Sequence, residues 1–308
     1  MLARLRSGDE IARLVTLVVA SCVLLIAVLL VVELYDSSAL SRQKLGWNFL
    51  ISRSWDPVAE DFGALPFIYG TVITSLLSLL VAVPLGVGAA IFLSELAPVR
   101  ISDALTFVVE LLAAVPSVIY GLLAVFVLVP PLREHVQPFL QTRLGFLPFF
   151  QGPLYGVSLL AAGLILAIMI LPFIVSISRE ALLAVPPEQR EAALAVGATR
   201  WEAAWGAVVP YARLGIAGSV FLALARALGE TMAVTMVIGN SPIISASLFS
   251  PGYSIAAVIA NEFTEAVGAM HVSALIELGL VLFALTILIN AAARLLLMAT
   301  EGKGAVGS

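Results

Sequence analysis

Charged side chains are scarce in this sequence. Only 12% of the 308 residues are Asp, Glu, Lys or Arg, whereas roughly 25% is typical of a soluble globular domain. Apolar residues make up 61% of the chain, and the mean hydropathy is +1.09. A soluble fold cannot cover that much apolar surface, and a disordered chain has the opposite composition. The sequence therefore predicts an integral membrane protein.

Cysteine and histidine are also scarce, which excludes several kinds of site. The single cysteine, Cys22, lies inside an apolar run, so an intrachain disulfide or a thiolate metal site is impossible. The two histidines, His135 and His271, lie far apart in the chain, which argues against a metal centre. The net charge of −4 is too small to indicate a nucleic-acid partner.

Long apolar runs, by contrast, are abundant. A helix rises about 1.5 Å per residue, so about 20 apolar residues cross a hydrocarbon core of about 30 Å. The first run follows three arginines, as in a secretory signal. It is longer than a typical signal core and no small-residue cleavage site follows, so we interpret it as a retained helix. We predict an all-α integral membrane protein with about six transmembrane helices: 11–32, 67–93, 104–129, 154–177, 214–238 and 273–298.

The placement of Lys and Arg predicts that both termini are cytoplasmic, since basic residues are enriched on that side of a membrane. On this topology the inner side contains ten basic residues: Arg4, Arg6, Arg13, Arg100, Arg179, Arg190, Arg200, Arg213, Arg294 and Lys303. The outer side contains five: Arg42, Lys44, Arg53, Arg133 and Arg143. The 252–271 segment has no Lys or Arg, which fits an external loop.

Three prolines lie inside predicted spans: Pro84, Pro116 and Pro172. Each removes a helical N–H and favours a kink or a break. Kinks of this kind are common in membrane helices and also suit a bundle that moves. No internal repeat and no low-complexity linker divides the chain, so we predict a single membrane domain.

The segment 186–210 is too charged to cross a membrane and has the signals of two short helices. Pro187 suits the first turn of a helix, and Gly197 suits a left-handed helix end. Thr199 and Glu202 form a capping-box pattern that begins a second helix. We expect that helix to end near the proline that closes the segment.

The same segment resembles the EAA loop of the binding-protein-dependent type I ABC permease family. The motif residues are Glu191, Ala192, Ala193, Gly197 and Pro210. Before the proline, the two apolar positions hold smaller residues than the usual Ile and Leu. The resemblance implies that this loop docks on a cytosolic ATPase. An ordinary amphipathic helix hairpin on the protein surface is the alternative interpretation.

No phosphate-cradling G-x-x-x-x-G-K-[ST] motif occurs in the chain. A transporter driven by ATP would therefore need a separate nucleotide-binding subunit. On this reading the chain is a transport subunit, not an enzyme, and it binds no cofactor of its own.

Four charges lie inside predicted spans: Glu110, Arg226, Glu230 and Glu277. Each costs about 2.5–3.5 kcal/mol at the bilayer centre unless it is paired or faces water. Arg226 is expected near the midplane, with Glu230 four residues later on the same helix face. A guanidinium offers a planar fork of donors for a tetrahedral oxyanion. Glu230 can orient that fork or accept a hydrogen bond from a monoprotonated anion.

A purely structural reading of these charges is open as well. An Arg–Glu pair can neutralise itself and fix the packing, although such pairs are costly to bury. Glu110 can satisfy Arg226 or a neighbouring helix, and Glu277 can reach the outer interface. We expect His135 and His271 to be ordinary residues of external loops.

The stretch from Arg226 to Asn240 closely resembles a segment of the permeases of phosphate-specific ABC importers. The segments 62–71, 93–98 and 110–121 are similar to that family too, so the resemblance covers about residues 60–300. It implies that Arg226, Glu230 and Glu110 line the substrate path. It also implies an N-terminal helix with an external polar segment (1–66), a permease domain (67–300) and a cytoplasmic tail (301–308).

The resemblance further implies the partners of such an importer. They are a second permease subunit, two copies of a cytosolic ATPase that binds ATP and Mg²⁺, and an extracytoplasmic phosphate-binding protein. The assembly would lie in a bacterial plasma membrane. Three alternatives stay open at this stage. One is a permease for another oxyanion such as molybdate or sulfate. The others are a non-transporting docking protein and an ion-driven transporter.

Overall fold

The structure is a computed structural model that describes the backbone of residues 9–304. Arg4, Arg6 and the last four residues of the predicted tail lie outside the described residues. Within them, six helices are long and apolar enough to cross a membrane, as the sequence predicts. Their bounds are Glu10–Ser37, Leu65–Leu96, Ser117–Leu144, Leu159–Leu183, Arg200–Gly229 and Ala269–Leu295.

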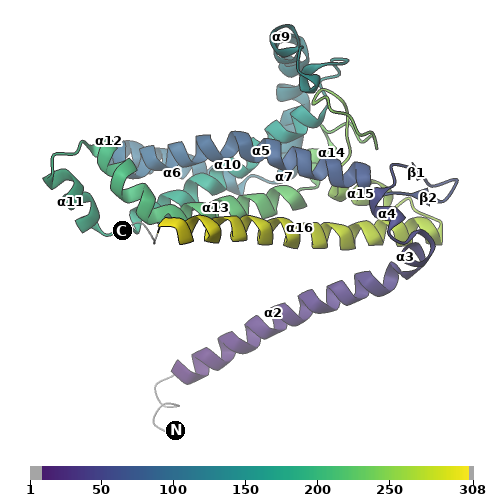
Figure 1. The fold of residues 1–308 in the computed structure, drawn as a ribbon, viewed down its shortest axis with the longest axis horizontal. Helices are drawn as coiled ribbons and strands as arrows, with labels where there is room; N and C mark the ends of the chain where they lie inside the picture. The colour runs from purple at the N-terminus through teal and green to yellow at the C-terminus, as the bar shows by residue number, and fades with distance from the viewer. Residues whose placement is uncertain (1–8, 305–308) are drawn as a thin grey trace.

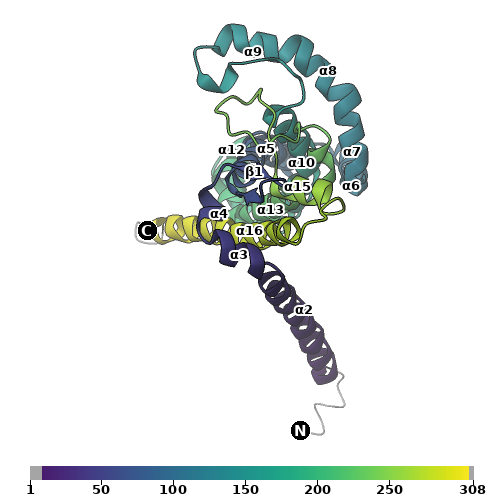
Figure 2. The ribbon, with the colours of Figure 1, turned by 90° about the vertical axis from the view of Figure 1, so that its right-hand side faces the viewer.

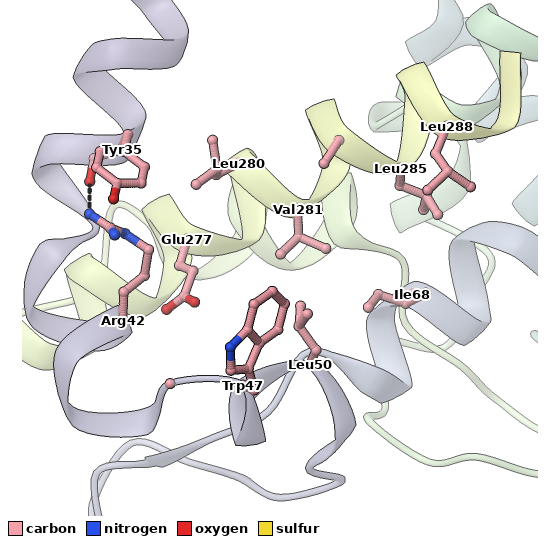
Figure 3. Close-up of a pocket in the computed structure, with 12 residues that line it drawn as sticks. Tyr35, Arg42, Trp47, Leu50, Ile68, Glu277, Leu280, Val281, Leu285 and Leu288 are labelled. Carbon is pink, nitrogen blue, oxygen red and sulfur yellow. Dashed lines mark hydrogen bonds between the residues drawn. The ribbon is translucent and has the colours of Figure 1, made fainter. Parts of the chain in front are cut away.

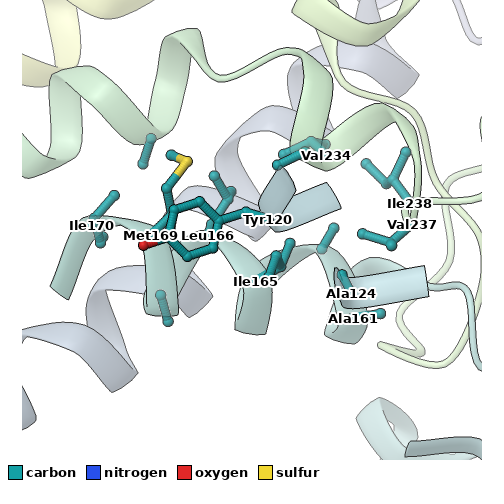
Figure 4. Close-up of a cluster of buried hydrophobic side chains, with 14 of the residues drawn as sticks. Tyr120, Ala124, Ala161, Ile165, Leu166, Met169, Ile170, Val234, Val237 and Ile238 are labelled. Carbon is teal, nitrogen blue, oxygen red and sulfur yellow. The ribbon is translucent and has the colours of Figure 1, made fainter. Parts of the chain in front are cut away.

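The bundle is built around α10 (Leu159–Leu183), which packs against α5 (Leu65–Ile91) and α13 (Val209–Gly229) (Figure 1). α10 is apolar all round, as expected of a helix enclosed by others. Its side chains dominate the main hydrophobic cluster, where Ile165, Leu166 and Ile170 are fully buried (Figure 4). The long helix α16 (Ala269–Gly304) runs along the side of this core.

The predicted helix 104–129 is wrong as a single element. Pro116 separates α6 (Val99–Ala114) from α7 (Ser117–Leu123). A proline disfavours helical geometry in the residue before it, and Val115 is extended, with φ −66° and ψ 129°. The membrane-long helix begins only after the break and runs from α7 to α9 (Gln137–Leu144), which arches away from the bundle (Figure 2).

Short helical segments complete the arch, which is the helix from Ser117 to Leu144, and the connections between helices. Within the arch lie two π-helical turns, η2 (Ala124–Leu128) and η3 (Leu132–Val136), on either side of α8 (Val129–Pro131). A third π-helical turn, η1 (Phe92–Leu96), extends α5, and a 3₁₀ turn, η4 (Pro148–Phe150), follows α9.

The first span stands apart from the others. α2 (Asp9–Ser37) contacts the rest of the chain through α3 (Ala39–Leu45) and α16, and its apolar window has no buried residues. In Figures 1 and 2 it points away from the bundle. An apolar helix with a fully exposed surface is stable in lipid, because a helix satisfies its own backbone hydrogen bonds.

A second hydrophobic cluster closes one end of the molecule. It joins α4 (Asn48–Ile51), α15 (Ile255–Glu262) and a two-stranded antiparallel hairpin, β1 (Trp55–Asp56) and β2 (Asp61–Phe62). The expectation of a plain external loop at 252–271 is therefore wrong in part. The segment contains α15, and its first four residues are buried against α5 and α16 because they are apolar.

Candidate functional site

The 186–210 segment forms the two predicted short helices at the end of the molecule opposite the β-hairpin (Figure 1). α11 (Pro187–Ala195) begins with Pro187 in its first turn. Gly197 has φ +92°, a left-handed conformation that glycine adopts without strain. Thr199 Oγ1 accepts from Glu202 N at 3.3 Å, and Glu202 Oε2 accepts from Thr199 N at 2.8 Å. The predicted capping box is confirmed.

The expected end of the second helix near Pro210 is wrong. α12 (Arg200–Ala203) continues through a π-helical turn, η5 (Ala204–Val208), directly into α13. A proline ring clashes with the carbonyl four residues earlier in a regular helix, and a π turn is one way to accommodate such a local disruption. Pro210 lies in the first turn of α13, immediately after that widened turn. The helix that contains the fifth predicted span therefore runs from Arg200 to Gly229, and the predicted end at 238 is wrong.

An ion pair that the sequence analysis missed fastens α11 to the bundle. Arg190 donates from Nε and Nη2 to both oxygens of Glu95 on η1, at 2.8–3.2 Å. Its other donors reach the carbonyl oxygens of Leu182 and Val185 at 2.7 and 2.6 Å. The hydrogen bonds with Glu95 raise the pKa of the Arg190 guanidinium. Nothing in the sequence links the two residues, because 95 positions separate them.

The outer surface of this hairpin is exposed and rich in apolar side chains. Glu191 and Ala192 are exposed, and Ala193 is half-buried. Val196 is 86% exposed. Two exposed indoles, Trp201 and Trp205, meet edge to face with centroids 5.6 Å apart. Contiguous apolar surface of this kind is typical of a site that binds another protein.

Arg226 lies in the last turn of α13, where a cation is favoured by the helix dipole. Its Cζ lies 4.2 Å from the centre of the Phe173 ring of α10, a cation–π contact. Phe173 directly follows Pro172, the proline inside α10. Arg226 Nε is buried and has no hydrogen-bond partner among the described residues.

Glu230 does not share a helix face with Arg226, and that prediction is wrong. α13 ends at Gly229, and Glu230 is extended, with φ −70° and ψ 129°. Glu230 Oε1 accepts from Ala233 N at 3.4 Å, and no described residue forms an ion pair with Arg226. A glycine before the turn lowers the cost of leaving the helix, which the four-residue spacing did not reveal.

Arg226 and Glu230 therefore flank a helix break. A short helix, α14 (Met232–Thr235), follows the break and docks on α7. The docking depends on Gly121, where a Cβ would meet Met236 Sδ at 2.5 Å. Broken helices inside a membrane occur where other protein or a water-filled path satisfies the freed backbone groups, as in many transporters.

The other predicted charges lie elsewhere. Glu110 is exposed on α6 and does not pair with Arg226 in the described part of the chain. Glu277, on α16, is only 6% exposed, so it does not reach the interface as a solvated side chain.

His271 is also more than a loop residue. Its Nε2 lies 3.1 Å from Glu262 Oε2, which accepts from Trp55 Nε1 at 2.8 Å. The imidazole stacks on the Phe62 ring with a centroid distance of 5.4 Å. This polar network ties β1 to α15 and α16. Among the described residues no three His, Cys, Asp or Glu side chains gather as a metal site.

Comparison with known proteins now gives the family. The model of binding-protein-dependent transport system inner membrane components matches residues 82–298. The chain belongs to this permease family. The match confirms the resemblance stated on the sequence, the predicted type I permease fold and the assignment as a transport subunit. Permeases of this family carry no cofactor of their own.

Individual relatives of this permease align over nearly its whole length. It is 49% identical to the phosphate transport system permease protein PstC of Mesorhizobium japonicum, over 96% of this chain and 91% of that protein. It is 46% identical to PstC of Haemophilus influenzae, over 96% of both chains. A probable PstC of Methanocaldococcus jannaschii is 37% identical over 93% of this chain and 92% of that protein.

Among solved structures, the permease is similar to chains of the MetNI methionine ABC transporter in inward-facing conformations. One such chain is 18% identical with a TM-score of 0.47, and the alignment covers 75% of this chain and 93% of that chain. A second crystal form gives 17% identity, a TM-score of 0.48 and the same coverage.

Proposed function

We propose that this chain is the permease subunit of an ATP-driven importer of inorganic phosphate. The observation that carries the proposal is the 46–49% identity to phosphate transport permeases over 96% of the chain. The chemistry of Arg226 supports it independently, because a membrane-embedded guanidinium suits a tetrahedral oxyanion.

In this proposal Arg226, Glu230 and Glu110 line the substrate path. The Phe173 ring contacts the flat face of the Arg226 guanidinium. The N–H groups around the edge of the guanidinium can therefore donate to an anion. The unpartnered Nε fits this role, since a buried donor without a partner is costly unless a ligand fills it. Glu230 accepts a hydrogen bond from the P–OH of a monoprotonated phosphate. Glu110, exposed on α6, meets the path where a second permease subunit closes it.

The motif Glu191, Ala192, Ala193, Gly197 and Pro210 transmits the motion of the ATPase in this proposal. The exposed apolar surface around Val196 and Trp201 supplies the contact area. Because α12 is continuous with α13, a push on the hairpin reaches Arg226 through one helix of 30 residues. A rigid helix can carry such a displacement over its full length.

The proposed assembly has a PstA-like second permease subunit, two PstB-like ATPase subunits that hold ATP and Mg²⁺, and a PstS-like phosphate-binding protein outside. It lies in a bacterial plasma membrane with both termini cytoplasmic. Residues 1–66 form the N-terminal helix and external segment, 67–300 form the permease domain with 186–210 as its coupling loop, and 301–308 form the tail.

The central test is phosphate uptake by the reconstituted complex with its binding protein. We expect Arg226→Gln to reduce uptake of radiolabelled phosphate by at least about 100-fold, because the charged hydrogen bonds to the anion are lost. Arg213→Gln is the matched control, since Arg213 is exposed on the same helix. Both variants are expected to copurify with their partners. Wild-type uptake by Arg226→Gln would contradict the proposed role.

The same proteoliposomes distinguish phosphate from other oxyanions. We expect phosphate to stimulate ATP hydrolysis, and sulfate and molybdate to neither stimulate it nor compete for uptake. Stimulation by molybdate or sulfate instead would assign the permease to that anion. Copurification without any anion-stimulated ATP hydrolysis would favour a docking protein.

A further inference from the structure

A groove of about 680 Å³ lies between the N-terminal helices and α16 (Figure 3). Leu280, Val281, Leu285 and Leu288 of α16 form much of one wall. From Glu277 to Leu288 the helix rises about 16 Å at 1.5 Å per residue. That length is close to one leaflet, half of a hydrocarbon core of about 30 Å. The groove therefore has the length and the lining of a site for an acyl chain.

The polar end of the groove contains two opposite charges, Arg42 and Glu277, and these are the only charged residues among those that line it. In Figure 3 the Glu277 side chain points toward Trp47, and the Arg42 guanidinium lies beside it against Tyr35. Trp47 is 85% exposed. Exposed tryptophan is typical of the level of lipid headgroups. The charged end therefore lies where a headgroup would, and the leucines lie where its chain would.

One oxygen of the Glu277 carboxyl group lacks a hydrogen-bond donor at this end, although Ser41 and Arg42 lie near the group. Its side chain is more than nine-tenths buried, and Oε2 has no hydrogen bond among the described residues. A buried carboxylate oxygen without a donor is costly. An ammonium group bound in the groove would supply the missing donor and the opposite charge.

The Arg42 guanidinium is held in place by neighbouring residues, but not all of its N–H groups have an acceptor among the described residues. Nε donates to Ser38 Oγ at 3.1 Å, Nη2 donates to Tyr35 O at 2.5 Å, and Cζ lies 3.5 Å from the centre of the Tyr35 ring. Within the described residues, Nη1 donates to no acceptor. A pre-oriented guanidinium with an available N–H is a good partner for a phosphodiester.

We propose that this groove binds a phosphatidylethanolamine molecule, with the phosphate on Arg42, the ammonium on Glu277 and one acyl chain along α16. The two charges match a headgroup that carries one anion and one cation. Phosphatidylglycerol has no cation for Glu277, and the quaternary nitrogen of phosphatidylcholine has no N–H to donate. The site is separate from the substrate path and from the 186–210 hairpin.

The test uses the assembled complex in nanodiscs that contain phosphatidylethanolamine with a photoreactive diazirine on its acyl chain. We expect cross-links on α16 between residues 280 and 288. Unlabelled phosphatidylethanolamine should compete, and phosphatidylcholine should not. Arg42→Gln and Glu277→Gln should each reduce the labelling about tenfold, as expected when a charge-assisted hydrogen bond is lost. Arg53→Gln, an exposed external arginine outside the groove, should leave it unchanged.

Two outcomes would overturn the proposal. Equal competition by both lipids in the wild-type complex would mean that the groove contacts bulk lipid only. A photoreactive amino acid at Trp47 that cross-links to the second permease subunit, with no lipid labelling, would mean that a protein helix fills the groove. The competition between the two unlabelled lipids uses only the wild-type complex, so it tests the proposal even if a variant fails to assemble.

Discussion

Arg226 shows how a charge can be stabilised in a membrane protein when no described residue forms an ion pair with it. The ring of Phe173 lies 4.2 Å from its Cζ, and a desolvated cation–π contact is worth about 2 kcal/mol. That is comparable to the cost of about 2.5–3.5 kcal/mol for a charge at the bilayer centre. An aromatic face neutralises no charge, so the arginine keeps its full attraction for an anion. A carboxylate partner would compete with the anion that we propose Arg226 binds.

Tyr253 gives a prediction for alkaline pH. Burial raises the pKa of its phenol to about 12, and Oη accepts from Asn261 Nδ2 at 3.0 Å. A folded-state pKa above the ordinary value of 10 means that the stability from the neutral phenol is fully present below pH 10. That stability is lost as the pH rises through 12. We expect an ultraviolet titration of tyrosinate to show one late-ionising group fewer in Tyr253→Phe than in the wild-type protein. A late component of unchanged amplitude in Tyr253→Phe would contradict this assignment.

Some residues were predictable because their chemistry is local. The capping box of Thr199 and Glu202 spans three residues, and the left-handed Gly197 follows directly from the helix before it. Glu230 was not predictable in the same way. Spacing alone placed it on the face of Arg226, but the helix ends one residue earlier because α14 turns away to dock on α7.

At the scale of elements, four prolines have three different outcomes. Pro84 and Pro172 stay inside α5 and α10, whereas Pro116 breaks its helix and Pro210 begins one after a π turn. Helices α5 and α10 pack closely against each other over much of their length, so tertiary contacts offset the lost hydrogen bond. The helix around Pro116 is largely exposed within this chain and has no such support.

The position of α11 depends on the Arg190–Glu95 pair, which yields a prediction for the hairpin. We expect Arg190→Gln to loosen α11 and to reduce the stimulation of ATP hydrolysis by the loaded binding protein at least about fivefold. A hydrogen bond to a charged group contributes about 1.5–3 kcal/mol to stability. The Arg190 side chain is 23% exposed, so we expect a contribution near the lower end of that range. The measurement is ATP hydrolysis with and without binding protein and phosphate.

Arg200→Gln is the control for that experiment, because Arg200 is exposed on α12. Glu95→Gln should reproduce the loss, since it removes the other half of the pair. If Arg190→Gln kept full stimulation while Arg200→Gln lost it, α11 would not be positioned through Glu95.

At the scale of the whole molecule, two hairpins lie at opposite ends (Figure 1). The 186–210 hairpin lies at one end, and the β-hairpin with α3 and α15 lies at the other (Figure 1). The proposed topology, with both termini cytoplasmic, predicts that Ser54 faces outside and Ala198 faces inside. In a Cys22→Ser background, we expect a membrane-impermeant maleimide to label Ser54→Cys in intact spheroplasts. Ala198→Cys should be labelled only after permeabilisation, and the reverse pattern would invert the proposed topology.

The sequence by itself determined what depends on composition and on neighbours in the chain. Scarce charge and long apolar runs gave the membrane class and six spans, because a helix must be about 20 apolar residues long to cross a bilayer. The motif of the 186–210 segment gave the hairpin. Only the tertiary structure decided where helices break, which charges meet and which stay unpartnered. Packing between distant elements pairs Arg190 with Glu95 and places Arg42 and Glu277 in the lining of one groove, and no local pattern encodes either arrangement.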